Sequence, residues 1–101
     1  MLTFVDNKHV YSFSANKEEL YITPSFVPFI RDTGCYIVMV NAKNHGPNGI
    51  FCCARSDKTS SGLVTALALS DTQLKLEWNP YEYPKICVQN KMEFDVVVIC
   101  T

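Results

Sequence analysis

The chain has 101 residues, of which 48% are hydrophobic and 19% charged, and its formal net charge is -1. A chain of this length and composition is expected to fold as one globular domain over residues 1–101. Lys and Arg never stand next to each other, so no basic patch for nucleic acid is indicated. No apolar run approaches the ~18 residues of a membrane span, and the N-terminus lacks a basic segment followed by an apolar stretch. We therefore expect neither membrane insertion nor a secretory signal.

The first part of the chain predicts short strands. Residues 2–5 and 10–14 are rich in β-branched and aromatic side chains, and residues 20–22 resume this pattern. Between them, residues 15–19 are the best candidate for a helical turn, with Asn16 as a possible N-cap.

Residues 23–30 carry two prolines among large apolar side chains. Because proline cannot donate a hydrogen bond to a strand ladder, this segment is expected to be an edge strand or an extended crossover. A turn at residues 31–34 leads from it into the next strand.

Residues 34–40 form the strand around which the rest of the chain is organised. They have no charge, and both alternating sets of side chains are apolar. One set is Cys35, Ile37 and Met39, and the other is Tyr36, Val38 and Val40. A strand with a single buried face would alternate between apolar and polar residues. We therefore expect both faces to be covered, one by the core and the other by further core or by a partner.

The middle of the chain predicts a hairpin followed by a further strand. Residues 41–49 contain Gly-Pro and Asn-Gly steps typical of turns, and residues 50–55 return as the antiparallel partner of the central strand. Residues 56–62 are a polar loop. Residues 63–69 can be read as a strand or as two helical turns, and their position between strands favours the strand.

The last part of the chain continues the β pattern. Residues 74–79 alternate with Leu74, Leu76 and Trp78 inward. The remaining elements are a tyrosine-bearing loop at 80–84, a short strand at 85–88, a turn at 89–91 and a long apolar strand at 94–100. About eight or nine short strands at a spacing of about 8–12 residues are typical of an all-β fold. We expect a small antiparallel two-sheet β-sandwich of jelly-roll type.

The five cysteines are Cys35, Cys52, Cys53, Cys87 and Cys100. An odd number cannot be fully paired within one chain, and most of these residues lie in apolar runs, where a thiol behaves as a small hydrophobic group. We expect reduced cysteines and folding in the cytosol. The alternative is a secreted protein with one or two disulfides and a leftover thiol.

One pattern suggests covalent catalysis, because Cys52 and Cys53 stand close to Arg55, which could lower a thiol pKa. The phosphatase arrangement needs a loop of five residues between Cys and Arg, and here the spacing is shorter. The alternative interpretation is two cysteines on opposite faces of a strand, and we prefer it.

Other catalytic or metal sites are not indicated. The two histidines, His9 and His45, are not placed near a cysteine by any pattern, and the cysteine spacing does not match a zinc finger. The late carboxylates are explained as outward-facing polar positions; they are Glu77, Glu82, Glu93 and Asp95. We expect no enzyme activity, no metal and no cofactor.

Recognition is the remaining class of function. The loop at residues 78–84 offers Trp78, Tyr81 and Tyr83 and is held by two prolines, and aromatic side chains on a stiff loop are typical of binding hot spots. The alternative is that Trp78 belongs to the core and the tyrosines cover it. A second binding candidate is the polar hairpin loop that contains Asn44 and His45.

The surplus of apolar surface points to assembly. Residues 24–30, 34–40 and 94–100 all present apolar side chains on both faces. A second copy of the chain is the simplest cover for such faces, so we expect a homo-oligomer.

Three resemblances bear on this expectation. Residues 32–36 resemble the Asp-x-Gly-x-Tyr corner of immunoglobulin domains, although Val38 stands where that family has a cysteine, and they are also similar to the Gly-x-Tyr strand of C1q and tumour-necrosis-factor jelly rolls. Residues 2–7 resemble a shaft repeat of trimeric viral fibres. Each resemblance covers less than a quarter of the chain. Together they imply a trimeric β-sandwich that binds a receptor.

Two functional hypotheses follow. The first is a non-enzymatic oligomeric recognition module, with a homotrimer favoured, that binds a protein or glycan receptor as the attachment head of a viral fibre-like protein on the virion surface. The absence of Asn-x-Ser/Thr sequons favours this over a secreted cytokine. The second is an intracellular protein–protein interaction domain, monomeric or dimeric, that uses a sheet edge or the loop at residues 78–84. An enzyme built on Cys52 or Cys53 comes third.

Overall fold

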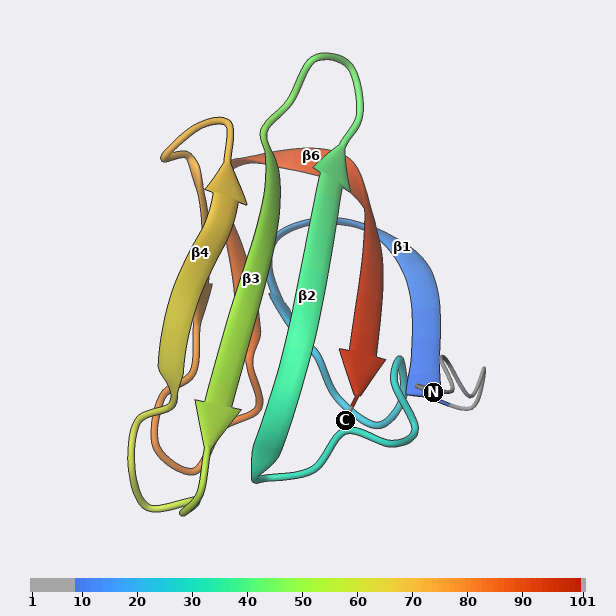
Figure 1. Cartoon of the computed structure of the whole chain (residues 1–101). Coiled ribbons are helices and arrows are strands. Elements are labelled where there is room, and N and C mark those ends of the chain that lie inside the picture. The colour runs from blue at the N-terminus through green and yellow to red at the C-terminus, as the bar shows by residue number, and fades with distance from the viewer. Residues whose placement is uncertain (1–8, 101) are drawn as a thin grey trace, which may run out of the picture.

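The computed structural model describes residues 9–100, which form an all-β fold (Figure 1). Its strands are β1 (Val10–Tyr21), β2 (Gly34–Ala42), β3 (Asn48–Arg55), β4 (Leu63–Leu69), β5 (Leu74–Glu77) and β6 (Lys85–Cys100). These six described strands belong to one antiparallel sheet in the order β1-β6-β2-β3-β4, and β5 pairs with β6 outside this path. The all-β antiparallel prediction is confirmed. The two-sheet sandwich of jelly-roll type is not confirmed, because strand pairing links all six strands into a single sheet.

The strand predicted at residues 34–40 is the central strand of this sheet, β2. Its residue Ile37 pairs with Ile99 of β6 on one side and with Cys52 of β3 on the other. The predicted hairpin of β2 and β3 is confirmed. Two residues at its tip, Asn44 and His45, have φ angles of 57° and 65°, so the chain reverses through a left-handed turn.

Strand β6 is long and bends, and β1 bends with it (Figure 1). The first part of β6, from Lys85 to Val88, pairs with β5 and with the end of β1. Its second part pairs with the beginning of β1 and with β2. A register shift between Lys17 and Glu19 lies at the bend of β1. The bend allows one continuous sheet to enclose a core.

Two predicted interruptions are wrong. Residues 15–19 are part of β1 and not a helical turn capped by Asn16, and residues 89–91 are part of β6 and not a turn. Asn16 pairs with Glu93, so the strand ladder continues through the polar stretch. Exposed polar residues occur at a bend as well as at a chain reversal, and local composition does not separate the two. The described residues therefore form six strands, where about eight or nine shorter strands were predicted. The strand predicted at residues 2–5 lies outside the described residues.

The segment from Ile22 to Thr33 crosses between β1 and β2 as a series of turns. Of the two predicted forms, it is a crossover and not an edge strand, but it is folded into turns and is not extended. Its residue Phe26 stacks on Phe13 of β1 with ring centroids 4.8 Å apart. The hydroxyl of Tyr36 donates a hydrogen bond to the Thr33 carbonyl (2.7 Å), which ties the end of the crossover to β2.

The core lies between the inner side of the β6-β2-β3 region and the layer made by β5 and the first part of β6. Its members include Val38 of β2, Phe51 of β3, Leu74 of β5, and Ile86 and Phe94 of β6. Full burial of such side chains contributes roughly 1.5–3 kcal/mol each. Since Ile86 and Phe94 come from the two parts of β6, the bend closes the sheet over a shared core.

Candidate functional site

The side of β6, β2 and β3 that faces away from the core carries an apolar patch, which we call the outer face. On β2, Val38 is fully buried, whereas Ile37 and Met39 on either side of it are only half-buried. Strands β3 and β6 alternate in the same way. The outer face consists of Ile37, Met39, Ile50, Cys52, Val97 and Ile99. The unusual feature is that the solvent side of this antiparallel sheet is apolar, where polar residues are normally found.

These six side chains form two rows across three strands. The rows of cross-strand partners are Ile99–Ile37–Cys52 and Val97–Met39–Ile50. Directly opposed residues of an antiparallel ladder have Cβ atoms about 4.5–5.5 Å apart, so the two rows make one continuous apolar surface. In Figure 1, β2 and β3 lie at the front of the molecule, and no described segment passes in front of them.

Two shallow hollows shape the outer face. The larger, of about 670 Å³, has Met39, Ile50 and Val97 in its lining. The smaller, of about 390 Å³, has Ile37 and Cys52 in its lining. The linings of both hollows include residues of β4, so the hollows reach the β4 edge of the sheet.

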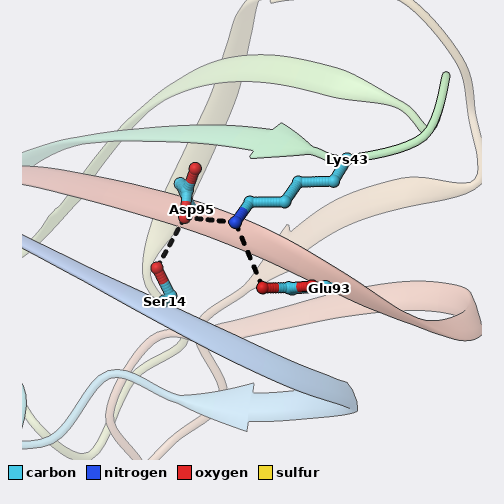
Figure 2. Close-up of polar contacts among 4 residues, drawn as sticks. All are labelled: Ser14, Lys43, Glu93 and Asp95. Carbon is cyan, nitrogen blue, oxygen red and sulfur yellow. Dashed lines mark hydrogen bonds and ion pairs between the residues drawn. The ribbon is translucent and has the colours of Figure 1, made fainter.

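A polar row closes the apolar patch at one end (Figure 2). The Ser14 hydroxyl donates to Asp95 Oδ1 (2.5 Å), and Lys43 Nζ lies 3.1 Å from Glu93 Oε1 and 3.9 Å from Asp95 Oδ1. The hydrogen bond to Glu93 and the nearby Asp95 carboxylate raise the pKa of Lys43. Asn41 pairs with Asp95 across the ladder and continues the row onto β2. Apolar centre and polar edge together have the layout of a protein interface and its rim.

The structure places the three aromatic residues of the predicted binding loop in different environments. Trp78 is 2% exposed and belongs to the core, and Tyr83 is half-buried against that core. Tyr81 is 72% exposed and has a φ angle of 65°. The Trp78 indole N–H donates to the Glu82 carbonyl (2.8 Å), so the ring holds the loop from within. Of the three predicted aromatic contact residues, Tyr81 is the one that presents its ring to solvent.

A residue that sequence reasoning used only as a neighbour of cysteine, Arg55, organises this loop. It is 5% exposed. Its guanidinium donates to the carbonyls of Asp32 (2.8 Å), Asn79 (2.8 Å) and Glu82 (3.0 Å). The sequence carried one signal that Arg55 is buried. Every second residue of β3 points to the core, and Arg55 follows Phe51 and Cys53 in that series.

The second predicted binding loop lies elsewhere. Asn44 and His45 are exposed at the tip of the β2–β3 hairpin, beyond the end of β3 that begins at Asn48. Arg55 and the loop that it holds lie at the other end of β3. The structure therefore does not bring Tyr81 together with Asn44 and His45.

The cysteine chemistry considered from the sequence finds no support in the geometry. Burial raises the pKa of the Cys53 thiol to about 12, so the thiol is protonated near neutral pH. The hydrogen bonds described for the Arg55 guanidinium go to backbone carbonyls. Cys52 faces the opposite way, on the outer face, as expected for adjacent residues of a strand.

Two further findings concern residues 9–100 alone. Within that range no group of three or more His, Cys, Asp or Glu side chains could hold a metal ion. The same residues contain no helix long and apolar enough to cross a membrane.

Comparison of the chain with protein-family models, with curated proteins and with solved structures found no match. The candidate site is therefore chosen by geometry. The outer face combines a continuous apolar area, two shallow hollows and a polar rim, whereas Tyr81 is a single exposed ring. The outer face is the stronger candidate.

Proposed function

We propose that this protein is a non-enzymatic, oligomeric recognition module, and that the outer face is the surface through which copies of the chain associate. The observation that carries the proposal is the pair of apolar rows centred on Ile37 and Met39, on a side of the sheet that no described segment covers. Exposed apolar patches bounded by polar residues are typical of protein interaction sites.

The energetics favour a covered outer face. Because the six side chains are already half-buried, covering one of them contributes less than about 1 kcal/mol, and covering all six contributes a few kcal/mol toward association. Association also costs translational freedom and side-chain entropy. The two associating surfaces must therefore also be complementary in shape and in the charges at their rims. The row of Ser14, Asp95, Lys43 and Glu93 supplies both signs of charge at the rim, which would orient a second copy.

The non-enzymatic part of the proposal is supported by Cys53. Its thiol is buried and has a pKa of about 12, so one of the two nucleophiles considered from the sequence is held in its unreactive form.

The narrower hypotheses of a trimer and of a viral attachment head that binds a receptor are supported by sequence resemblance alone. A trimer remains one possible result of the mass measurement described below. If such a receptor exists, Tyr81 is the candidate contact, because its ring is exposed while the Tyr81 N–H is held by the Lys58 carbonyl (2.7 Å).

The same observation on Tyr81 favours the alternative function, an intracellular protein–protein interaction domain that is monomeric or dimeric. In that case the loop held by Arg55 and Trp78 presents one rigid aromatic anchor to a partner. The two functions differ in native mass, which makes mass the first quantity to measure.

The test is light scattering on the purified chain over a range of concentrations, with Met39→Lys and Ile37→Lys as separate variants. We expect the wild type to have a mass of several protomers and each variant to dissociate at concentrations at which the wild type remains associated. A charged side chain on the outer face cannot be buried without a large desolvation cost. Asn90→Lys adds the same charge at an exposed position of the β6 bend and should leave the mass unchanged.

Circular dichroism confirms that each variant is folded. A wild type that stays monomeric at every concentration contradicts the oligomeric proposal and leaves the interaction domain as the better reading. An oligomer whose mass neither lysine variant changes shows that association uses another surface.

A further inference from the structure

Strand β4 is an edge strand without the usual protection against pairing. In the sheet order it stands last, and among the described strands it pairs with β3 alone. The next element along the chain, β5, pairs with β6 and not with β4. In an antiparallel strand, alternate residues direct their N–H and C=O groups to each side, so one side of β4 offers backbone groups to a new strand.

The side chains of β4 add to this exposure. Leu63, Leu67 and Leu69 are 78%, 60% and 39% exposed. The strand sequence LVTALAL contains no charge and no proline. Edge strands of soluble proteins normally carry lysine or proline, or are very short, because these features block edge-to-edge association. The one protective feature on β4 is a register shift opposite Ile50 and Phe51, which leaves the run Leu63–Ala66 in regular pairing with β3.

We infer that the free edge of β4 pairs with β4 of a second copy of this chain, antiparallel and across a two-fold axis. Such an axis places a residue near the middle of the strand opposite or beside its own copy, so a charged residue there would meet its own charge. β4 has no charged residue, so two copies of β4 can pair in any antiparallel register without placing like charges together.

A second copy is also favoured by continuity with the outer face. The hollows of the outer face extend onto β4 through Thr65 and Ala68, and Leu63 lies in the lining of the smaller hollow. Pairing of two β4 strands would join two five-strand paths into one sheet and two outer faces into one apolar surface. The pairing itself depends on the edge of β4 and not on whether the outer face is covered.

The experiment combines native mass with hydrogen exchange on the full chain. In the wild type, we expect the exchange of backbone amides in β4 to slow by at least about tenfold between dilute and concentrated protein, because pairing protects them. In the double variant Thr65→Lys/Leu67→Lys, the facing lysines should raise the dimer dissociation constant at least about tenfold and remove this protection. Both positions are exposed, so the variant should fold.

A matched control, Asn16→Lys/Asn90→Lys, adds the same two charges at exposed positions of β1 and β6 and should behave as the wild type. The inference is overturned if exchange in β4 does not depend on protein concentration, or if the double variant keeps the wild-type mass and protection. If Met39→Lys alone changes the mass while β4 exchange is independent of concentration, the outer face associates and the edge does not. If the β4 variant alone changes both quantities, the edge associates without the outer face.

Discussion

The guanidinium of Arg55 lies over the indole ring of Trp78, with 4.7 Å between its Cζ and the ring centroid, and both side chains are almost fully buried. Arg55 has three strong carbonyl partners, and Trp78 donates to one of the same carbonyls, that of Glu82. This pair connects the end of β3 to the loop that carries Tyr81. The positions of that loop and of the turn before β2 therefore depend on one buried cation.

Arg55→Lys is predicted to destabilise the fold by about 2–4 kcal/mol. A lysine keeps the charge, but its single nitrogen cannot reach the three carbonyls that three separate guanidinium nitrogens contact, so buried carbonyls lose their partners. The free energy of unfolding in urea measures this cost. Arg31→Lys is the control, because Arg31 also donates to backbone carbonyls but is exposed, and it should cost less than about 1 kcal/mol. Equal costs for the two variants would contradict a supporting role of Arg55.

Gly62→Ala is predicted to destabilise the fold by about 1–3 kcal/mol through crowding. A Cβ at this position would lie 2.7 Å from Cε3 of Trp78, and the Gly62 N–H is held by the Trp78 carbonyl at 2.8 Å, so the backbone cannot move away freely. Thermal unfolding followed by tryptophan fluorescence reports both stability and the ring environment. The adjacent exposed residue provides the control Ser61→Ala, which should leave both unchanged. A Gly62→Ala variant as stable as the control would show that the ring can shift.

Cys53 is predicted to resist alkylation in the native protein at pH 8, while Cys35, which is an exposed residue, is modified. Burial both blocks access and keeps the Cys53 thiol protonated. Mass spectrometry of peptides after a short iodoacetamide pulse gives the order of modification, and the unfolded chain in urea serves as the control. Modification of Cys53 at the rate of Cys35 would contradict its burial.

The same thiol makes stability depend on alkaline pH. The pKa of Cys53 rises from its ordinary value of 9.0 to about 12 on folding, so the contribution to stability is complete below pH 9. Between pH 9 and about 12 the unfolded chain releases the proton and the folded chain keeps it, so stability falls as pH rises. Cys53→Ala should make this alkaline decline shallower, as measured by urea unfolding at several pH values. An unchanged slope in the variant would mean that other groups cause the decline.

The period of β2 could be predicted from the sequence. Because side chains alternate along a strand, residues 34–40 had to place Tyr36, Val38 and Val40 on one side and the other three apolar side chains on the opposite side. The hairpin with β3 followed from the turn residues between them. The excess of apolar side chains on both faces also pointed to the surface that is now the outer face.

The sequence could not show which set faces the core, because both sets are apolar. Nor could it show that β1 and β6 continue through polar stretches, because continuity there depends on pairs such as Asn16 with Glu93, residues far apart in the chain. The role of Arg55 was hidden for the same reason. Its partners come from separate segments and meet only in the folded chain.

Local alternation thus determined the hairpin strands β2 and β3 and the two apolar sides of β2, since it needs only neighbouring residues. The bend of the sheet, the core side of β2, the unprotected edge of β4 and the buried Arg55 were decided by tertiary structure, since each depends on contacts between distant segments.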